Sequence, residues 1–191
     1  MTVGGGDANQ ALQIADFAIS LITYEEYCVD DSMERTRCHQ ITDVQNGDIL
    51  ISKSSHTLLY RHGHAGIVVD AANGLVLEAI GYGTPSLIQP LDKWNYFPTV
   101  KVLRLKDADE AVGDEIAQIA LTKYQGITYD ILAHRQDVDS THCSDIVWKV
   151  FNEFGYDLDS TGGIFVSPQD ISKSEYLEEV MSFGFSNTRP W

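Results

Sequence analysis

Apolar residues recur along the chain at two spacings, one typical of helices and the other of β-strands. Helical spacing predicts three helices, over residues 8–22, 107–124 and 141–154. Short apolar or alternating segments predict five strands, at residues 49–51, 64–70, 75–80, 99–105 and 179–185. Because the strands lie centrally, with helices before and after them, the pattern indicates an α+β fold.

Capping residues mark where the later helices begin. Thr141 is the expected N-cap of the third helix, and Ser167 followed by Pro168 is typical of the start of a short helix. The predicted second helix has acidic residues in its first turns, where the helix dipole favours negative charge. Residues 126–140 show no regular spacing and are expected to be irregular.

The remaining segments fit a single domain over residues 1–191. Residues 1–7 contain three consecutive glycines and are expected to be a flexible start. Residues 24–46 are polar and acidic, which predicts an insertion or loop. A domain of this size can bury enough apolar surface to fold without disulfides or metals.

The charge excludes several classes of function. Lysine and arginine number 13 and aspartate and glutamate 28, so the net charge is −15. Such a surface repels phosphates, and we expect neither a nucleic-acid partner nor binding to anionic membranes. No apolar run is long enough to span a membrane. No secretory signal is visible, which places the chain in the cytoplasm by default, although a removed export signal would look the same.

Three cysteines leave at least one thiol unpaired. The odd count without a signal peptide favours free thiols. Cys28 and Cys38 can also form a disulfide in an oxidising compartment, or they can join His39 in a metal site. The metal alternative lacks a Cys-x-x-Cys pair and a fourth ligand, so we expect no metal. No nucleotide-binding or other cofactor motif is present either, and no cofactor is predicted.

Cys143 lies in the predicted first turn of the third helix. Unpaired N–H groups and the positive end of the helix dipole face that turn, and they favour the thiolate over the thiol. The alternative is a buried structural cysteine. Acidic residues cluster at 25–34, 107–115 and 175–179, so a lowered pKa at Cys143 must come from local groups.

Two further residues fit a thiol-based site. His64 begins a predicted strand and is followed by the small residues Ala65 and Gly66, which leave room for another element to pack closely. An imidazole there can activate a thiol across the core. Glu78 interrupts an apolar strand and can approach His64 if the two strands pair, which would orient the imidazole. A surface-turn histidine and an exposed glutamate are the alternatives.

Several segments, in this order, resemble one family. They are Gly47-Asp48-Ile49-Leu50, His64-Ala65-Gly66-Ile67-Val68-Val69, Leu77-Glu78-Ala79, Gly126-Ile127-Thr128-Tyr129-Asp130, Cys143-Ser144-Asp145-Ile146-Val147-Trp148 and Ser167-Pro168-Gln169-Asp170-Ile171. The sequence is similar to circularly permuted members of the NlpC/P60 papain-like superfamily, the YiiX/YebB-like cysteine hydrolases. In unpermuted members the cysteine precedes the histidine, whereas here His64 precedes Cys143.

The resemblance implies a permuted papain-like α+β fold, with a central antiparallel sheet or small barrel packed against helices. It also implies that Cys143 is the nucleophile, His64 the base and Glu78 the residue that orients it. Tyr129 and His142 are implied to lie near the substrate, although Tyr129 can equally be a packing aromatic. Four more aromatic residues fit either a cleft wall or the core: Tyr82, Trp94, Tyr96 and Phe97.

These observations predict a cysteine hydrolase that cleaves an amide in a peptide or isopeptide, and family resemblance suggests a cell-wall stem peptide. One alternative is a lipid-directed acyl hydrolase or acyltransferase that uses the same residues. Another is a binding module on this fold without turnover. The predicted partner is a peptide or acyl small molecule, and the sequence leaves the oligomeric state open.

Overall fold

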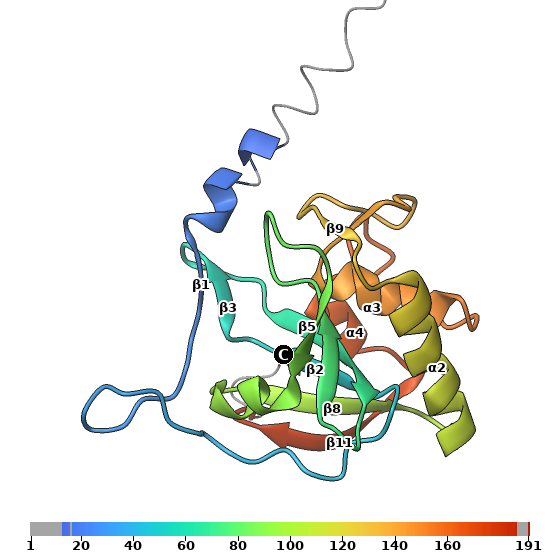
Figure 1. Cartoon of the computed structure of the whole chain (residues 1–191), viewed down its shortest axis with the longest axis horizontal. Helices are drawn as coiled ribbons and strands as arrows, with labels where there is room; N and C mark the ends of the chain where they lie inside the picture. The colour runs from blue at the N-terminus through green and yellow to red at the C-terminus, as the bar shows by residue number, and fades with distance from the viewer. Residues whose placement is uncertain (1–12, 16, 187–190) are drawn as a thin grey trace, which may run out of the picture.

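The computed structural model describes residues 13–15, 17–186 and 191, and its centre is a six-stranded antiparallel sheet (Figure 1). The strands lie in the order β11 (Leu177–Phe183), β8 (Val100–Leu105), β2 (Ile49–Ser52), β5 (His64–Asp70), β6 (Leu75–Glu78) and β7 (Leu87–Pro90). The described strands form no closed barrel, so the expected central sheet is confirmed and its barrel alternative is wrong. The mixture of sheet and helices confirms the α+β class.

The two faces of the sheet are covered differently. The helices α2 (Glu110–Lys123) and α3 (Cys143–Asn152) pack on one face, where Ile49 and Ile51 point into the larger core cluster. Leu50 points to the other face, which is covered by the 3₁₀ helix η1 (Leu91–Tyr96). This alternation along β2 follows from the two-residue period of a strand.

The start of α3 differs by one residue from the sequence expectation. The N-cap is His142, whose ring Nδ1 accepts a hydrogen bond from the backbone N–H of Asp145 at 3.4 Å. Thr141 was expected to be this cap, but it belongs to β10 (Ser140–Thr141), which pairs with β9 (Thr128–Tyr129). Because Thr141 is held in a strand by its pairing with Tyr129, the helix begins one residue later and His142 becomes the N-cap.

The other late elements agree with the capping signals. Helix α2 begins at Glu110 with Asp109 as its N-cap. The short helix α4 (Pro168–Ser172) begins as predicted, and Ser167 forms a reciprocal capping box with Asp170. Among the described residues, no helix is long and apolar enough to cross a membrane.

The N-terminal helix does not contribute to the core as expected. Residues 13–15 and 17–20 are helical, while residues 1–12 and 16, including the expected flexible start, lie outside the described part of the chain. Phe17 is 51% exposed and meets only the edge of Tyr82, with ring centroids 5.9 Å apart. In the described part of this helix the large apolar side chains Ile14 and Phe17 are both more than half exposed.

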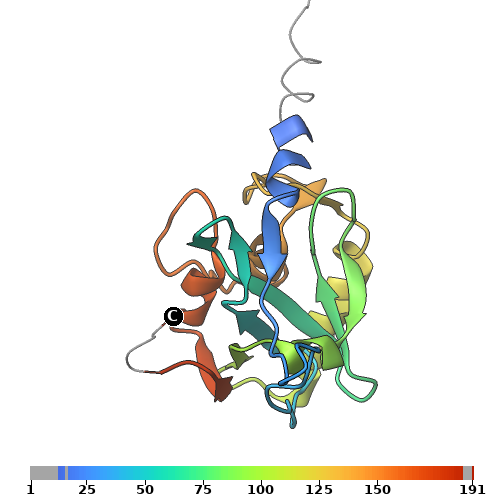
Figure 2. The ribbon, with the colours of Figure 1, turned by 90° about the vertical axis from the view of Figure 1, so that its left-hand side faces the viewer.

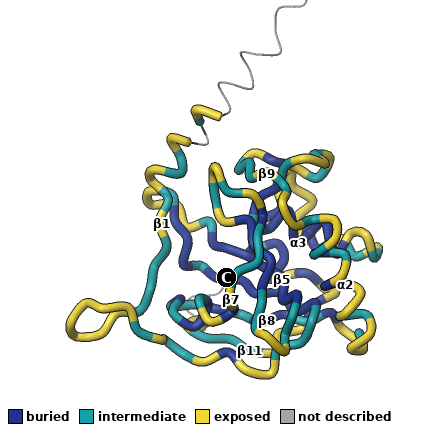
Figure 3. Tube along the Cα trace, in the orientation of Figure 1, coloured by how far each residue is buried: buried dark blue, intermediate teal, exposed yellow. Residues whose placement is uncertain are grey.

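The acidic segment 24–46 is a loop that also begins with a strand. Strand β1 (Thr23–Glu25) pairs with β3 (Ser55–Thr57), which pairs in turn with β4 (Tyr60–Arg61), in a small second sheet (Figure 2). These three strands, β7 and η1 were not predicted, because each is short and has little periodicity. Figure 3 shows that burial is concentrated in the main sheet and α3, whereas the loop after β1 is mostly exposed.

A disulfide joins Cys28 and Cys38 across this loop. The backbone N–H groups of the two cysteines donate to the carbonyls of Tyr96 and Asn95 at 3.0 and 2.8 Å, and these bonds attach the loop to η1. The disulfide uses both sulfurs that the metal alternative required. His39 instead stacks on Phe183, with ring centroids 4.1 Å apart.

Candidate active site

The pairing of β5 with β6 brings His64 and Glu78 together. Gly66 lies directly opposite Glu78 in the sheet, and His64 is two residues from Gly66 on the same face. A Cβ atom at Gly66 would lie 2.8 Å from Val76 Cγ1 and 3.1 Å from Glu78 Cγ. The glycine therefore provides the space in which the Glu78 side chain lies.

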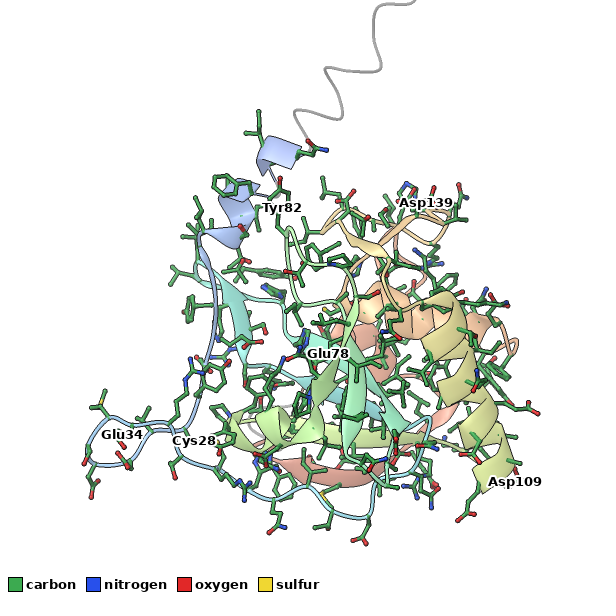
Figure 4. All side chains as sticks on the ribbon, in the orientation of Figure 1. Cys28, Glu34, Glu78, Tyr82, Asp109 and Asp139 are labelled. Atoms are coloured by element: carbon green, nitrogen blue, oxygen red, sulfur yellow. A yellow bond between two sulfur atoms is a disulfide. The ribbon has the colours of Figure 1, made fainter. Side chains whose placement is uncertain are left out.

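Glu78 is completely buried and accepts hydrogen bonds from three donors (Figure 4). Its Oε2 lies 2.6 Å from His64 Nε2 and 2.7 Å from Lys93 Nζ, and its Oε1 lies 3.0 Å from Trp94 Nε1. Burial alone would raise the pKa of this carboxyl, but the contacts with His64 and Lys93 outweigh it and lower the pKa. Glu78 is therefore ionised at neutral pH.

Sequence reasoning missed the two partners that η1 supplies. Trp94 is fully buried, donates to Glu78 and also stacks on the His64 ring, with centroids 5.3 Å apart. Lys93 supplies a positive charge beside the carboxylate. A buried carboxylate requires hydrogen-bond partners, so the burial of Glu78 implies further donors besides His64. The sequence could not show which element would provide them.

Cys143 is the first residue of α3 and is partly exposed, at a cleft. Burial raises the pKa of its thiol, but hydrogen bonds and charge from His142 and His64 prevail and lower the pKa well below its usual value. Burial likewise opposes protonation of His64, yet its hydrogen bonds to Cys143 and Glu78 raise the pKa to about 9. The two pKa shifts run in opposite directions, and both favour a thiolate–imidazolium pair over a neutral thiol and a neutral imidazole.

The hydrogen bonds also assign the ring nitrogens of both histidines. His64 Nε2 contacts Glu78, which leaves Nδ1 for the Cys143 thiol. His142 Nδ1 accepts from the Asp145 backbone, which favours the tautomer with a proton on Nε2. His142 is thus a donor beside the thiol, a closer role than the cleft wall that the sequence suggested.

A cleft of about 730 Å³ opens over the thiol, and its wall is mostly apolar. Cys143, His142 and Tyr129 all line it, so the structure brings together the five residues singled out from the sequence. Of the four aromatic residues left open between cleft and core, Tyr82 lines the cleft, while Trp94 and Phe97 are buried in the core. Tyr96 lies outside the cleft, beneath the Arg37 guanidinium.

Comparisons with known proteins identify the family and the fold. The model of a family described as permuted papain-like amidases, YaeF/YiiX, C92 family, matches residues 43–189. The uncharacterized protein YycO of Bacillus subtilis (strain 168) is 23% identical over 130 residues, which are 68% of this chain and 53% of YycO. This chain therefore spans about half the length of that relative.

One solved structure shares the fold. It is the crystal structure of the metalloprotein yiiX from Escherichia coli O157:H7, with a TM-score of 0.55 and 24% identity. The match covers 72% of this chain and 96% of that one. Because the family model covers most of this sequence, the chain belongs to the permuted papain-like amidases of the YaeF/YiiX, C92 family.

Proposed function

We propose that this chain is a cysteine hydrolase that cleaves an amide bond in a peptide or isopeptide, with Cys143 as nucleophile, His64 as general acid and base, and Glu78 orienting His64. One observation carries the proposal, namely that His64 lines the cleft together with Cys143, whose pKa it lowers, while its Nε2 is bonded to the buried Glu78. A nucleophile, a base and a residue that orients the base are the parts that covalent acyl transfer requires.

In the first half of the reaction, the Cys143 thiolate attacks the amide carbonyl carbon and a C–S bond forms. The imidazolium of His64 then gives its Nδ1 proton to the leaving nitrogen, the C–N bond breaks, and the amine departs. In the second half, neutral His64 takes a proton from water, which attacks the thioester. The C–S bond breaks, the carboxylic product leaves, and the thiolate–imidazolium pair is restored.

The tetrahedral intermediates carry a negative oxygen that needs donors. The backbone N–H of Cys143 lies in the first turn of α3, where it has no acceptor within the helix. The Nε2–H of His142 is a second donor at the same place. We assign both to the intermediate oxygen, which makes His142 more than a wall of the substrate cleft.

Two alternatives are weaker on these observations. The apolar wall of the cleft favours an acyl substrate as the second candidate, and an ester would react by the same steps. A binding module without turnover has no need for a thiol and an imidazole whose pKa values are shifted in opposite directions. A cell-wall stem peptide remains one example of the amide class.

The yiiX protein from Escherichia coli O157:H7 is described as a metalloprotein. In residues 13–15, 17–186 and 191 of this chain, no group of three or more His, Cys, Asp or Glu side chains is placed to hold a metal ion. The residues here do not fit such a site, and no step of the proposed reaction passes through a metal.

The disulfide bears on the compartment. Disulfides form and persist mainly in oxidising environments. The Cys28–Cys38 bond therefore argues for such an environment rather than for the cytoplasm expected by default.

A panel of peptide amides, isopeptides, muropeptides and acyl esters tests the proposal, with Cys143→Ala as the control. We expect the wild-type chain to cleave amides faster than esters of the same acyl group, relative to the uncatalysed rates, and Cys143→Ala to be inactive. Intact mass after a rapid quench should show an acyl group on Cys143. Turnover that persists in Cys143→Ala would overturn the proposal, while ester-only turnover would select the second candidate.

A further inference from the structure

We propose that Arg35 binds a carboxylate of the substrate, and that the aromatic part of the cleft holds an apolar body between this carboxylate and the bond cleaved at Cys143. The inference rests on the proposed function, since it names the substrate class for the same cleft. That class is an amide of apolar groups with a free carboxylate, such as an acylated amino acid or a short apolar peptide with a free C-terminus.

Arg35 lines the same cleft as Cys143. Its guanidinium carbon lies 3.8 Å above the centre of the Tyr27 ring, and Tyr27 packs in turn against Phe97, with centroids 5.4 Å apart. Stacking on a ring occupies the face of a guanidinium and leaves the N–H groups at its edge free to donate. These N–H groups match the two oxygens of a carboxylate.

Arg35 differs from the other arginines of an acidic protein. Among the arginines whose placement is described, every other one has an acidic partner. These pairs are Arg37–Asp92, Arg61–Glu26, Arg104–Asp48 and Arg135–Asp159. Within the described residues, Arg35 has no such ion pair, although the chain contains 28 acidic residues. An unpaired guanidinium at the cleft is therefore available to an anion from solution.

The acidic residue that lines the cleft is already engaged in a hydrogen bond. Glu25 also lines the cleft, and its carboxylate accepts a hydrogen bond from the Tyr27 hydroxyl. Tyr27 thus supports Arg35 with its ring and holds Glu25 with its hydroxyl. The result is a positive group that keeps its hydrogen-bonding capacity in a region of negative charge.

The loop that carries Arg35 is held in place. The bridge between Val29 and Arg35 and the Cys28–Cys38 disulfide close the loop, and both cysteines bond to the backbone of η1. An arginine on such a loop loses less side-chain and backbone freedom on binding than one on an open loop.

The other side chains that line the cleft favour a substrate with apolar groups. Tyr24, Tyr60, Ile80, Tyr82 and Phe165 line the cleft, and each of them is more than one-third exposed in the absence of a ligand. Covering such surfaces is favourable in proportion to the apolar area removed from water. A substrate with apolar groups would therefore gain most from this wall.

Bromoacetyl peptides of one, two or three leucines test the inference without relying on turnover. Each is made with a free carboxylate and, as its neutral match, with a carboxamide. The bromoacetyl group alkylates the Cys143 thiolate, so intact mass follows the reaction and saturation kinetics separate affinity from reactivity. Arg35→Gln removes the charge, and Arg37→Gln is the matched control, because Arg37 lies on the same loop but pairs with Asp92.

We expect the carboxylate form of the best length to bind about tenfold more tightly than its carboxamide, as a partly exposed charge-assisted pair allows. Arg35→Gln should abolish this preference without changing the saturating rate, and Arg37→Gln should retain it. Equal affinities in the wild-type chain, or a preference that survives Arg35→Gln, would overturn the inference. Neither result touches the proposed function, which is tested separately by the loss of amide turnover in Cys143→Ala.

Discussion

Two regions of the molecule meet at the cleft, and they are built differently. The catalytic body, which we define as β2, β5, β6, η1 and α3, surrounds Glu78 with buried side chains. The N-terminal segment, residues 17–40, is largely exposed, and its Phe17 contacts the edge of the Tyr82 ring. Figure 4 shows the same contrast, with Glu78 in the interior and Glu34 on a loop that extends away from the body.

The contrast indicates that the two regions serve different purposes, one for the reaction and one for contact with the substrate. A thiolate–imidazolium pair needs fixed distances and little water, which only a packed body provides. Side chains that contact the substrate must instead be exposed to solvent before it binds. The family match begins at residue 43, so it includes His64, Glu78 and Cys143 but excludes Tyr27 and Arg35. The residues of the proposed reaction thus lie inside the matched region, whereas the proposed carboxylate-binding Arg35 lies outside it.

The largest expected effect comes from His64→Ala in the catalytic body. It removes the general acid and base, so kcat/KM should fall about 10³-fold, within the range for such groups. Steady-state kinetics on the best amide substrate provide the measurement. His62→Ala is the matched control, since His62 also lines the cleft but is not bonded to Glu78. A smaller loss in His64→Ala than in His62→Ala would remove His64 from its assigned role.

Glu78→Gln should follow, with a loss of about 10²-fold in kcat, because the amide cannot stabilise the imidazolium as a carboxylate does. Wild-type kcat/KM should fall at high pH as His64 loses its proton near pH 9. Without the carboxylate that helps to raise this pKa, the fall should begin at lower pH. Glu179→Gln, which removes an exposed ion pair with Lys101, should change neither quantity. An unchanged alkaline limb in Glu78→Gln would contradict the assigned contact.

The strands and the helix α3 of the catalytic body could be predicted from sequence to a large extent, whereas η1 could not. Residues 64–70 form the expected strand with its bounds unchanged, and the spacing of His64, Gly66 and Glu78 on two paired strands already placed the carboxylate near the imidazole. Local signals sufficed there, because strand period and pairing fix which side chains share a face.

The rest of the site depends on contacts distant in sequence. Lys93 and Trp94 reach Glu78 from a 3₁₀ helix that has no strong periodic pattern. The predicted N-terminal helix had the right spacing, but spacing cannot tell a helix against a core from one that covers a cleft edge. Arg35 was not singled out at all, because its position depends on a disulfide that the sequence allowed but did not favour over free thiols.

The smallest effect should come from opening the N-terminal segment. The double variant Cys28→Ser with Cys38→Ser releases the loop that carries Arg35. For a substrate with a carboxylate, KM should rise several-fold, up to the roughly tenfold value of the arginine contact itself, while kcat stays unchanged. Tm should fall, because the disulfide no longer restricts the unfolded chain. A fall in kcat at constant KM would mean that the two regions do not divide as described.

The central claim is that Cys143 is a thiolate held by His64, and a pH titration of its alkylation by iodoacetamide tests it most directly. In the wild-type chain the rate should reach half its plateau at a pH well below the ordinary range of a thiol, because His64 and His142 lower the pKa. In His64→Ala the midpoint should move upward, since one of the two stabilising groups is lost. An ordinary midpoint in the wild-type chain, or the same midpoint in both proteins, would contradict the account.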